Sequence, residues 1–142
     1  DTVNIKDAFV VNIGVNFEIV TLPNYNNNQI LTNCITSLQS FFETSRWQIN
    51  QPILLRDIST LLDNITGVQT VNNISISNKA GTQSGYSQYA YDVSGALQNG
   101  TIFPSIDPMI FEVKYPNTDI IGRVVTIGQS GGSTTNGGGR NY

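Results

Sequence analysis

The side chains that could do chemistry in this chain are ten carboxylates, seven cations and one cysteine, because the sequence contains no histidine. Histidine is the commonest general acid and base, and its pairs with serine or cysteine activate many nucleophiles. Neither pair can be built here, and a zinc site made of cysteine and histidine is excluded as well. Carboxylates are the remaining candidates for catalysis.

Paired carboxylates catalyse hydrolysis when a cleft holds them roughly 5–9.5 Å apart. Most acids in this chain fall at expected caps, turns or exposed strand positions, where solubility explains them. Asp107 with Asp119 is the one pair that we single out for testing. No run of acids has the alternating spacing of a calcium loop, and the late glycine clusters lack the lysine of a phosphate loop. The sequence therefore predicts neither an enzyme nor a metal or cofactor site.

Cys34 is the single cysteine, so no disulfide can form within the chain. It falls on the apolar stripe of a predicted helix. We interpret it as a buried structural thiol rather than a reactive one.

Charge is sparse along the chain. Charged residues make up 12% of the sequence and the formal net charge is −3, with about half the charged share of a typical globular domain. The cations are scattered, so nucleic-acid binding is not expected. No apolar run reaches roughly 18 residues, so no membrane-spanning helix is predicted. A weakly charged, polar surface suits permanent assembly better than electrostatic steering. Such surfaces also occur in ordinary extracellular and viral proteins, and between the two interpretations we favour assembly.

The elements that must position these side chains begin with an alternating segment. Apolar residues at every second position from Phe9 to Ile19 predict a strand with one buried face, which Pro23 ends. A turn-rich loop with good N-cap residues then leads into a helix. Trp47, in the link after that helix, is interpreted as a core plug. The apolar stripe of the helix consists of Leu31, Cys34, Ile35, Leu38, Phe41 and Phe42.

A second helix and a second strand follow. The helix carries Leu54, Ile58, Leu61, Leu62 and Ile65, and Gly67 is placed to end it. The strand covers 68–76, with a bulge or bend at Asn72-Asn73, where the apolar phase changes. One-sided helices and half-buried strands cover one another. Residues 1–80 therefore predict a β-α-α-β core of an α+β fold, with two helices packed on an antiparallel or mixed sheet.

Residues 81–127 predict a β-rich extension of the same domain. The close spacing of Tyr86, Tyr89 and Tyr91 has two interpretations, a carbohydrate- or protein-binding surface or the outer strand of the same sheet, and we favour the strand. Asn99-Gly100 predicts a hairpin turn. Further strands are expected at 109–115 and 120–127, joined by a turn and with Gly122-Arg123 interrupting the second. Residues 128–142 are rich in glycine and serine and predict a flexible tail.

Several stretches resemble the C-terminal region of baseplate J-like proteins and of baseplate wedge proteins from T4-like myoviruses. The first similarity is an order of elements: a strand, a Pro-x-Tyr turn at Pro23-Asn24-Tyr25, an amphipathic helix and a linker. It continues through Pro52-Ile53-Leu54-Leu55-Arg56-Asp57-Ile58 and the step Gly67-Val68-Gln69-Thr70-Val71. The second, more specific similarity is the run Ile106-Asp107-Pro108-Met109-Ile110-Phe111-Glu112-Val113-Lys114-Tyr115-Pro116-Asn117-Thr118-Asp119-Ile120.

The resemblance implies a virion structural protein of a bacteriophage with a contractile tail. Such proteins close the wedge ring of the baseplate around the tail tube, pair with copies of themselves and with neighbouring wedge subunits, and have no enzymatic activity. They are made in the host cytoplasm and end up in the tail baseplate. Because the chain begins at Asp1 and is short for such a protein, we expect it to be a piece of a longer one.

Contact residues for such an assembly are expected on the extension and its turns. The runner-up hypothesis is a carbohydrate- or receptor-binding module of a phage tail that uses Tyr86, Tyr89 and Tyr91. For the residues expected to make assembly contacts, local packing within the extension is an equally good interpretation. These candidates are Tyr89, Tyr91, Phe103, Pro104, Tyr115, Pro116 and Asn117.

Overall fold

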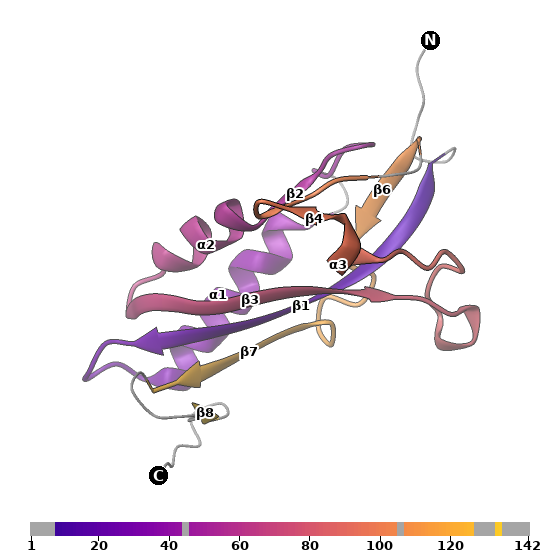
Figure 1. Cartoon of the computed structure of the whole chain (residues 1–142). Coiled ribbons are helices and arrows are strands. Elements are labelled where there is room, and N and C mark those ends of the chain that lie inside the picture. The colour runs from indigo at the N-terminus through magenta and orange to yellow at the C-terminus, as the bar shows by residue number, and fades with distance from the viewer. Residues whose placement is uncertain (1–7, 44–45, 105–106, 127–132, 135–142) are drawn as a thin grey trace.

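A single long strand, β1 (Phe9–Thr21), runs through the middle of the main sheet (Figure 1). The computed structural model describes residues 8–43, 46–104, 107–126 and 133–134, and its fold is α+β. The other strands are β2 (Ile53–Leu54), β3 (Val68–Lys79), β4 (Leu97–Gln98), β5 (Thr101–Ile102), β6 (Met109–Glu112), β7 (Ile120–Val125) and β8 (Ser133–Thr134). The helices are α1 (Asn27–Phe41), α2 (Leu55–Asp63) and α3 (Val93–Ala96), with a 3₁₀ turn, η2 (Thr82–Ser84).

The main sheet is mixed, which is one of the two forms, antiparallel or mixed, that the sequence predicted. β3 runs antiparallel to β1 on one side. On the other side β6 pairs in parallel with the start of β1, and β7 pairs in parallel with Val15–Ile19. β6 and β7 therefore form one interrupted line beside β1, and β8 pairs with the end of β7.

The alternating pattern of β1 produces its core face. Val11, Ile13, Val15 and Ile19 are fully buried, and Phe17 is almost so. The expectation of only one buried face is wrong for the first half of the strand, because Asn12 is also buried. Residues far along the chain cover that half, and period-two alternation cannot reveal such a cover.

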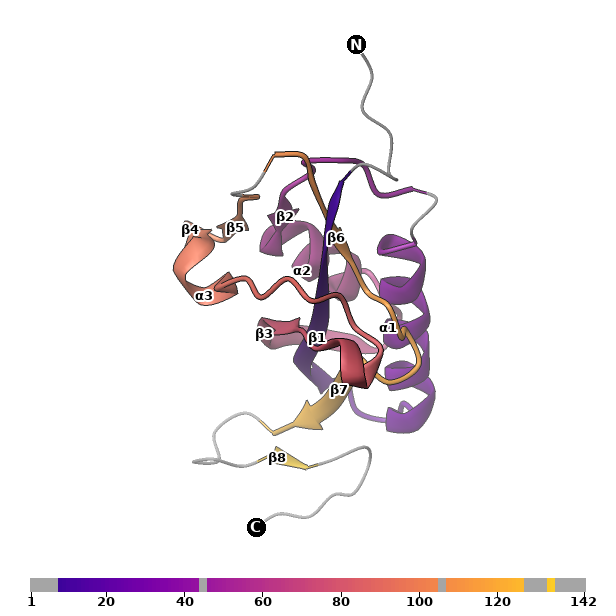
Figure 2. The ribbon, with the colours of Figure 1, turned by 90° about the vertical axis from the view of Figure 1, so that its right-hand side faces the viewer.

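Helix α1 forms where the sequence predicts it and covers one face of the sheet together with α2 (Figure 2). Its N-cap, Asn26, accepts a hydrogen bond from the Gln29 amide at 3.0 Å. Trp47 is buried against the rings of Phe41 and Phe42, with centroids 5.4 and 5.1 Å away, so its interpretation as a core plug is confirmed.

Helix α2 is shorter than predicted. Ile58 and Leu62 point into the core, but Leu54 belongs to β2 and Ile65 follows the helix end at Asp63. Ile53 and Leu54 pair with Ile102 and Thr101 of β5, and the sequence around Ile53 does not indicate this partner strand. Gly67, four residues beyond the helix, does adopt a positive φ of 97°, in the turn that leads into β3.

Two local predictions in the strands are confirmed. Glu18 pairs with Asn73 and Ile19 with Val71, so Asn72 is the extra residue of a bulge. Asn99 and Gly100 adopt φ values of 51° and 80° between β4 and β5, as a type I′ turn requires. β4, β5 and β2 form a separate small sheet.

Three predictions in the extension are wrong. The strand expected at 109–115 ends at Glu112. Residues 85–92 form no strand, so the tyrosines do not belong to an outer strand of the sheet. β7 runs through Gly122 and Arg123 without interruption. Instead, side chains of β1 and β3 accept hydrogen bonds from backbone amides of residues 85–92. Of the predicted tail, 128–142, only Ser133 and Thr134 lie within the described residues.

Candidate interaction surface

Residues 86–92 cross the main sheet near the start of β1 and are fixed there by polar contacts. The Ser87 amide donates to Asn12 Oδ1 at 2.7 Å, and the Tyr91 amide donates to Asn78 Oδ1 at 2.9 Å. The Asn12 side chain also donates to Glu112 Oε1 at 2.7 Å. The side-chain amides of Asn12, which is buried, and Asn78, which is half-buried, thus bind backbone groups that a strand would have paired in its ladder.

The rings of two predicted contact residues, Tyr89 and Tyr91, pack on the protein's own core. Tyr89 meets Phe9 edge-on at 4.9 Å, and Tyr91 meets Phe111 at 5.8 Å. The Tyr91 hydroxyl donates to the Phe103 carbonyl oxygen. Both tyrosines are half-buried, so part of each side chain is covered by packing within the chain.

The other predicted contact residues fall into two groups. Phe103 and Pro104 follow β5, and the Phe103 side chain is 47% exposed. Tyr115, Pro116 and Asn117 form the turn between β6 and β7, and all three are exposed. In α1, Gln39 Nε2 donates to the Pro116 carbonyl at 3.0 Å and to Asn117 Oδ1 at 3.2 Å.

A tyrosine–carboxylate contact ties that turn to the crossing segment. The Tyr86 hydroxyl donates to the Asp119 carboxylate, with its oxygen 2.9 and 3.0 Å from the two carboxylate oxygens. Asp119 is only 6% exposed. This hydrogen bond, then burial, and then the charge of Asp119 raise the pKa of Tyr86 above its ordinary value. The Tyr86 ring also packs on Tyr115 at 5.3 Å.

The structure separates the two carboxylates that the sequence singled out as a pair. Asp107 accepts a hydrogen bond from Asn50 Nδ2 at 2.8 Å and lies just before β6, which starts opposite Phe9. Asp119 lies just before β7, which starts opposite Val15. Six strand residues span about 20 Å, well beyond the roughly 5–9.5 Å of a hydrolytic pair. The predicted pairing is therefore wrong.

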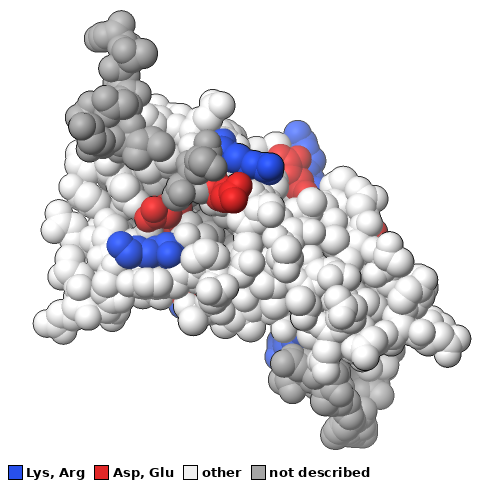
Figure 3. Space-filling model, turned by 180° about the vertical axis from the view of Figure 1, so that it is seen from behind, with Lys and Arg blue, Asp and Glu red and all other residues white. Residues whose placement is uncertain are grey.

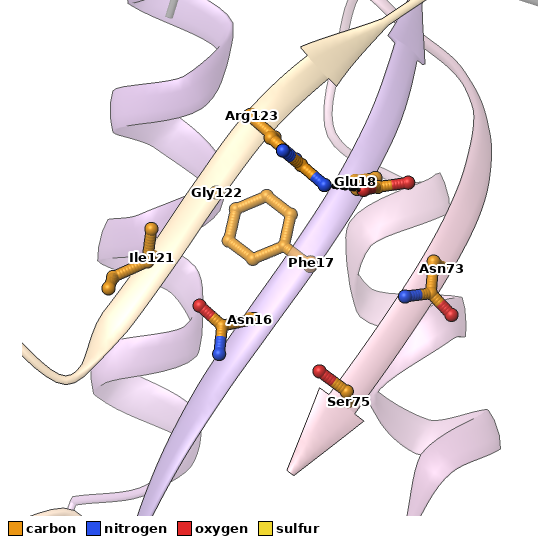
Figure 4. A pocket seen from close by; sticks show the side chains of 8 residues that line it. All are labelled: Asn16, Phe17, Glu18, Asn73, Ser75, Ile121, Gly122 and Arg123. Carbon is orange, nitrogen blue, oxygen red and sulfur yellow. Dashed lines mark hydrogen bonds and ion pairs between the residues drawn. The ribbon is translucent and has the colours of Figure 1, made fainter. Parts of the chain in front are cut away.

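A hollow of about 580 Å³ on the sheet was missed by the sequence reasoning (Figure 4). Glu18 forms an ion pair with Arg123 there and also accepts from Asn72 Nδ2 at 2.9 Å. Ile121 at its border is 54% exposed. The polar residues between the apolar ones of β1 were the available signal, but they are equally typical of a solvated face. The hollow is lined by Asn16, Phe17, Glu18, Asn73, Ser75, Ile121, Gly122 and Arg123.

On the face shown in Figure 3, charged side chains lie in small, separated groups among uncharged residues. Among the described residues, no group of three Cys, Asp or Glu side chains could hold a metal ion. Within the same ranges, no helix is long and apolar enough to cross a membrane. Cys34 is fully buried, and burial raises its pKa to about 12.

Two comparisons by sequence gave no match. No protein-family model matches the chain, and no curated protein matches it. The assignment of function therefore depends on the residues and on the geometry described above.

Proposed function

We propose that this chain is a structural subunit of the wedge ring in a contractile phage tail baseplate, where it acts through protein–protein contacts. In this proposal it resides in the virion, after synthesis in the host cytoplasm, and contacts copies of itself and neighbouring wedge subunits. The resemblance of residues 106–120 to the end of wedge proteins carries the proposal.

The position of that stretch in the fold supports the proposal. Residues 107–120 supply all of β6, the turn held by Gln39 and the first residue of β7. They therefore build much of one side of the sheet. The stretch exposes two charged residues, Asp107 and Lys114, and the uncharged run Tyr115 to Thr118. An uncharged run of this kind suits a permanent contact better than a transient, electrostatically steered one.

No observation favours the carbohydrate- or receptor-binding alternative. A sugar-binding platform needs aromatic faces that are open to solvent. Tyr86, Tyr89 and Tyr91 instead pack edge-on against three different rings, those of Tyr115, Phe9 and Phe111. They do not form one flat surface.

A complementation experiment tests the proposal. A stop codon is placed in the gene of the encoding phage, and the protein is supplied from a plasmid. We expect particles without assembled baseplates in its absence and normal particles in its presence. Infectious particles with intact baseplates in the absence of the protein would refute the assignment.

Two matched variants separate a contact role from stability. Phe103 and Tyr25 are 47% and 48% exposed, and only Phe103 is a predicted contact residue. We expect Phe103→Asp to fold but not to restore assembly, and Tyr25→Asp to restore it. Normal assembly with Phe103→Asp would remove Phe103 from the contact surface.

A further inference from the structure

The described strands cover only part of the outer edge of β7. On its inner side β7 pairs with β1 from Ile120 to Val124. On its outer side β8 pairs with Val124 and Val125 alone. Within the part of the chain that the structure describes, no strand pairs with Ile120–Arg123 on that outer side.

The backbone groups at this edge are oriented for strand addition. The Asp119 carbonyl accepts a hydrogen bond from the Val15 amide at 2.8 Å, so Asp119 directs its backbone toward β1. Successive residues of a strand direct their N–H and C=O groups to opposite edges. The backbone N–H and C=O groups of Ile121 and Arg123 therefore point toward β1. Those of Ile120 and Gly122 point away from β1, toward the outer edge of the sheet. Such groups are a template for another strand.

Helix α1 turns this edge into a groove. The groove has a volume of about 520 Å³ and lies between the first half of α1 and the start of β7. On the helical side the groove is lined by two apolar residues, Leu31 and Ile35, and by two polar ones, Asn28 and Thr32. Thr118 belongs to the turn at one end. Addition of an extended peptide as a strand at a sheet edge is a recurring mode of peptide binding, in which main-chain hydrogen bonds give affinity and side-chain pockets give specificity. The lining residues are Asn28, Leu31, Thr32, Ile35, Asn117, Thr118, Ile120, Ile121 and Gly122.

The chemistry of the lining specifies the occupant. None of the nine lining residues is charged, so a charged side chain in the groove would lose water without gaining an ion-pair partner. Ile121 is 54% exposed beside the edge and offers apolar contact to a residue of an added strand. β8 already pairs antiparallel with the next residues of the same edge.

We propose that the groove between α1 and β7 binds an extended, uncharged segment of another protein, which adds to the sheet as a strand antiparallel to β7. Backbone hydrogen bonds to Ile120 and Gly122 provide the binding, and the uncharged walls select the segment. This inference does not depend on the baseplate assignment, because a peptide groove can serve any assembly.

The test uses the full chain and a blocked hexapeptide of alternating threonine and valine, followed by amide NMR shifts. We expect saturable shifts at Ile120, Gly122 and Thr32. The same peptide with its alternate amides N-methylated, on the edge that faces β7, loses binding because it cannot donate to β7. A version with lysine in place of valine binds roughly tenfold more weakly.

Matched variants on α1 locate the site. Thr32 lines the groove and Thr36, one turn further along, does not, and both side chains are exposed. We expect Thr32→Trp to weaken binding of the hexapeptide by roughly tenfold or more, and Thr36→Trp to leave it unchanged.

Three outcomes would overturn the proposal. The first is the absence of saturable shifts at millimolar peptide, and the second is equal binding of the N-methylated peptide. The third is a set of shifts at Ile120 and Gly122 that appears on concentrating the chain without peptide, since the occupant would then be a second copy. The peptide results stand even if a tryptophan variant fails to fold.

Discussion

At the scale of single residues, the Tyr86 hydroxyl donates a hydrogen bond to the buried Asp119 carboxylate. Tyr86→Phe keeps the ring but removes this donor, so we expect a lower free energy of unfolding at neutral pH. Tyr115→Phe, on the ring that packs against Tyr86, is the control and should change stability less. Urea unfolding of both variants measures the difference, and equal losses would contradict the assigned role of the hydroxyl.

The same contact predicts a pH dependence. The folded state raises the pKa of Tyr86, so the unfolded chain loses this proton first as the pH rises. The stabilisation is complete below the ordinary tyrosine pKa of about 10 and is lost as the pH rises through the higher folded value. We expect the alkaline fall in unfolding free energy to be shallower in Tyr86→Phe than in the parent. Identical slopes would show that Tyr86 does not contribute.

Asn50 holds the start of β6. Its side chain accepts from the Met109 amide at 2.9 Å and donates to Asp107, and its backbone has a positive φ of 63°. Asn50→Gly keeps the backbone but loses both side-chain bonds, at a cost of about 1–2 kcal/mol. Asn50→Ala should cost about 1 kcal/mol more, because alanine disfavours this backbone conformation. Denaturant titration checks the order, and an alanine variant as stable as the glycine variant would contradict it.

Cys34 tests the burial of α1. With its side chain fully buried and its pKa raised to about 12, the thiolate needed for reaction is scarce. We expect no labelling by an aromatic disulfide reagent in the native protein at mildly alkaline pH, and complete labelling in denaturant. Rapid labelling without denaturant would mean that α1 opens locally.

At the scale of elements, Gly122 allows β7 to lie beside β1. A Cβ at this position would overlap the Phe17 ring, which is buried opposite it. We expect Gly122→Ala to cost about 1–3 kcal/mol through overpacking. Phe17→Leu in the same chain should recover part of that loss, because the smaller side chain leaves room. Strictly additive losses in the double variant would contradict this contact.

Sequence periodicity correctly predicted the elements in which one face packs on the core and the other does not, because such packing gives the sequence a regular apolar pattern. The alternation of β1, the apolar stripe of α1, the extra residue at Asn72 and the Asn99-Gly100 turn all follow from local rules, and all are present. The start of α2 was missed because Ile53-Leu54 pairs with residues about fifty positions later. A local window contains no information about such a partner.

The candidate sites were harder to predict than the elements. Tyr89 and Tyr91 have the two-residue spacing of a strand face, but Asn12 and Asn78 bind the backbone of this segment and hold it in an irregular path. The hollow around Glu18 and the groove beside α1 both depend on the position of β7, about one hundred residues after β1. Their lining residues become neighbours only when β7 pairs with β1.

At the scale of the whole molecule, the sheet depends on a line of strands contributed by the last third of the chain. β7 covers β1 from Val15 to Ile19 and buries Ile120, Val124 and Val125. Burying each of these three side chains contributes about 1.5–3 kcal/mol, so roughly 5–9 kcal/mol is lost without β7. That is comparable with the total stability of a small domain, about 5–15 kcal/mol.

We therefore expect a chain that ends after Lys114 to lose its cooperative unfolding transition, whereas a chain that ends after Thr126 keeps it. The longer variant retains all of β7 and, of the pairings between described strands, loses that of β8 with Val124 and Val125. Circular dichroism during thermal unfolding distinguishes the two, with the full chain as reference. A cooperative transition in the shorter chain would show that β1, β3 and the helices fold without β7, and that β7 is added to a finished core.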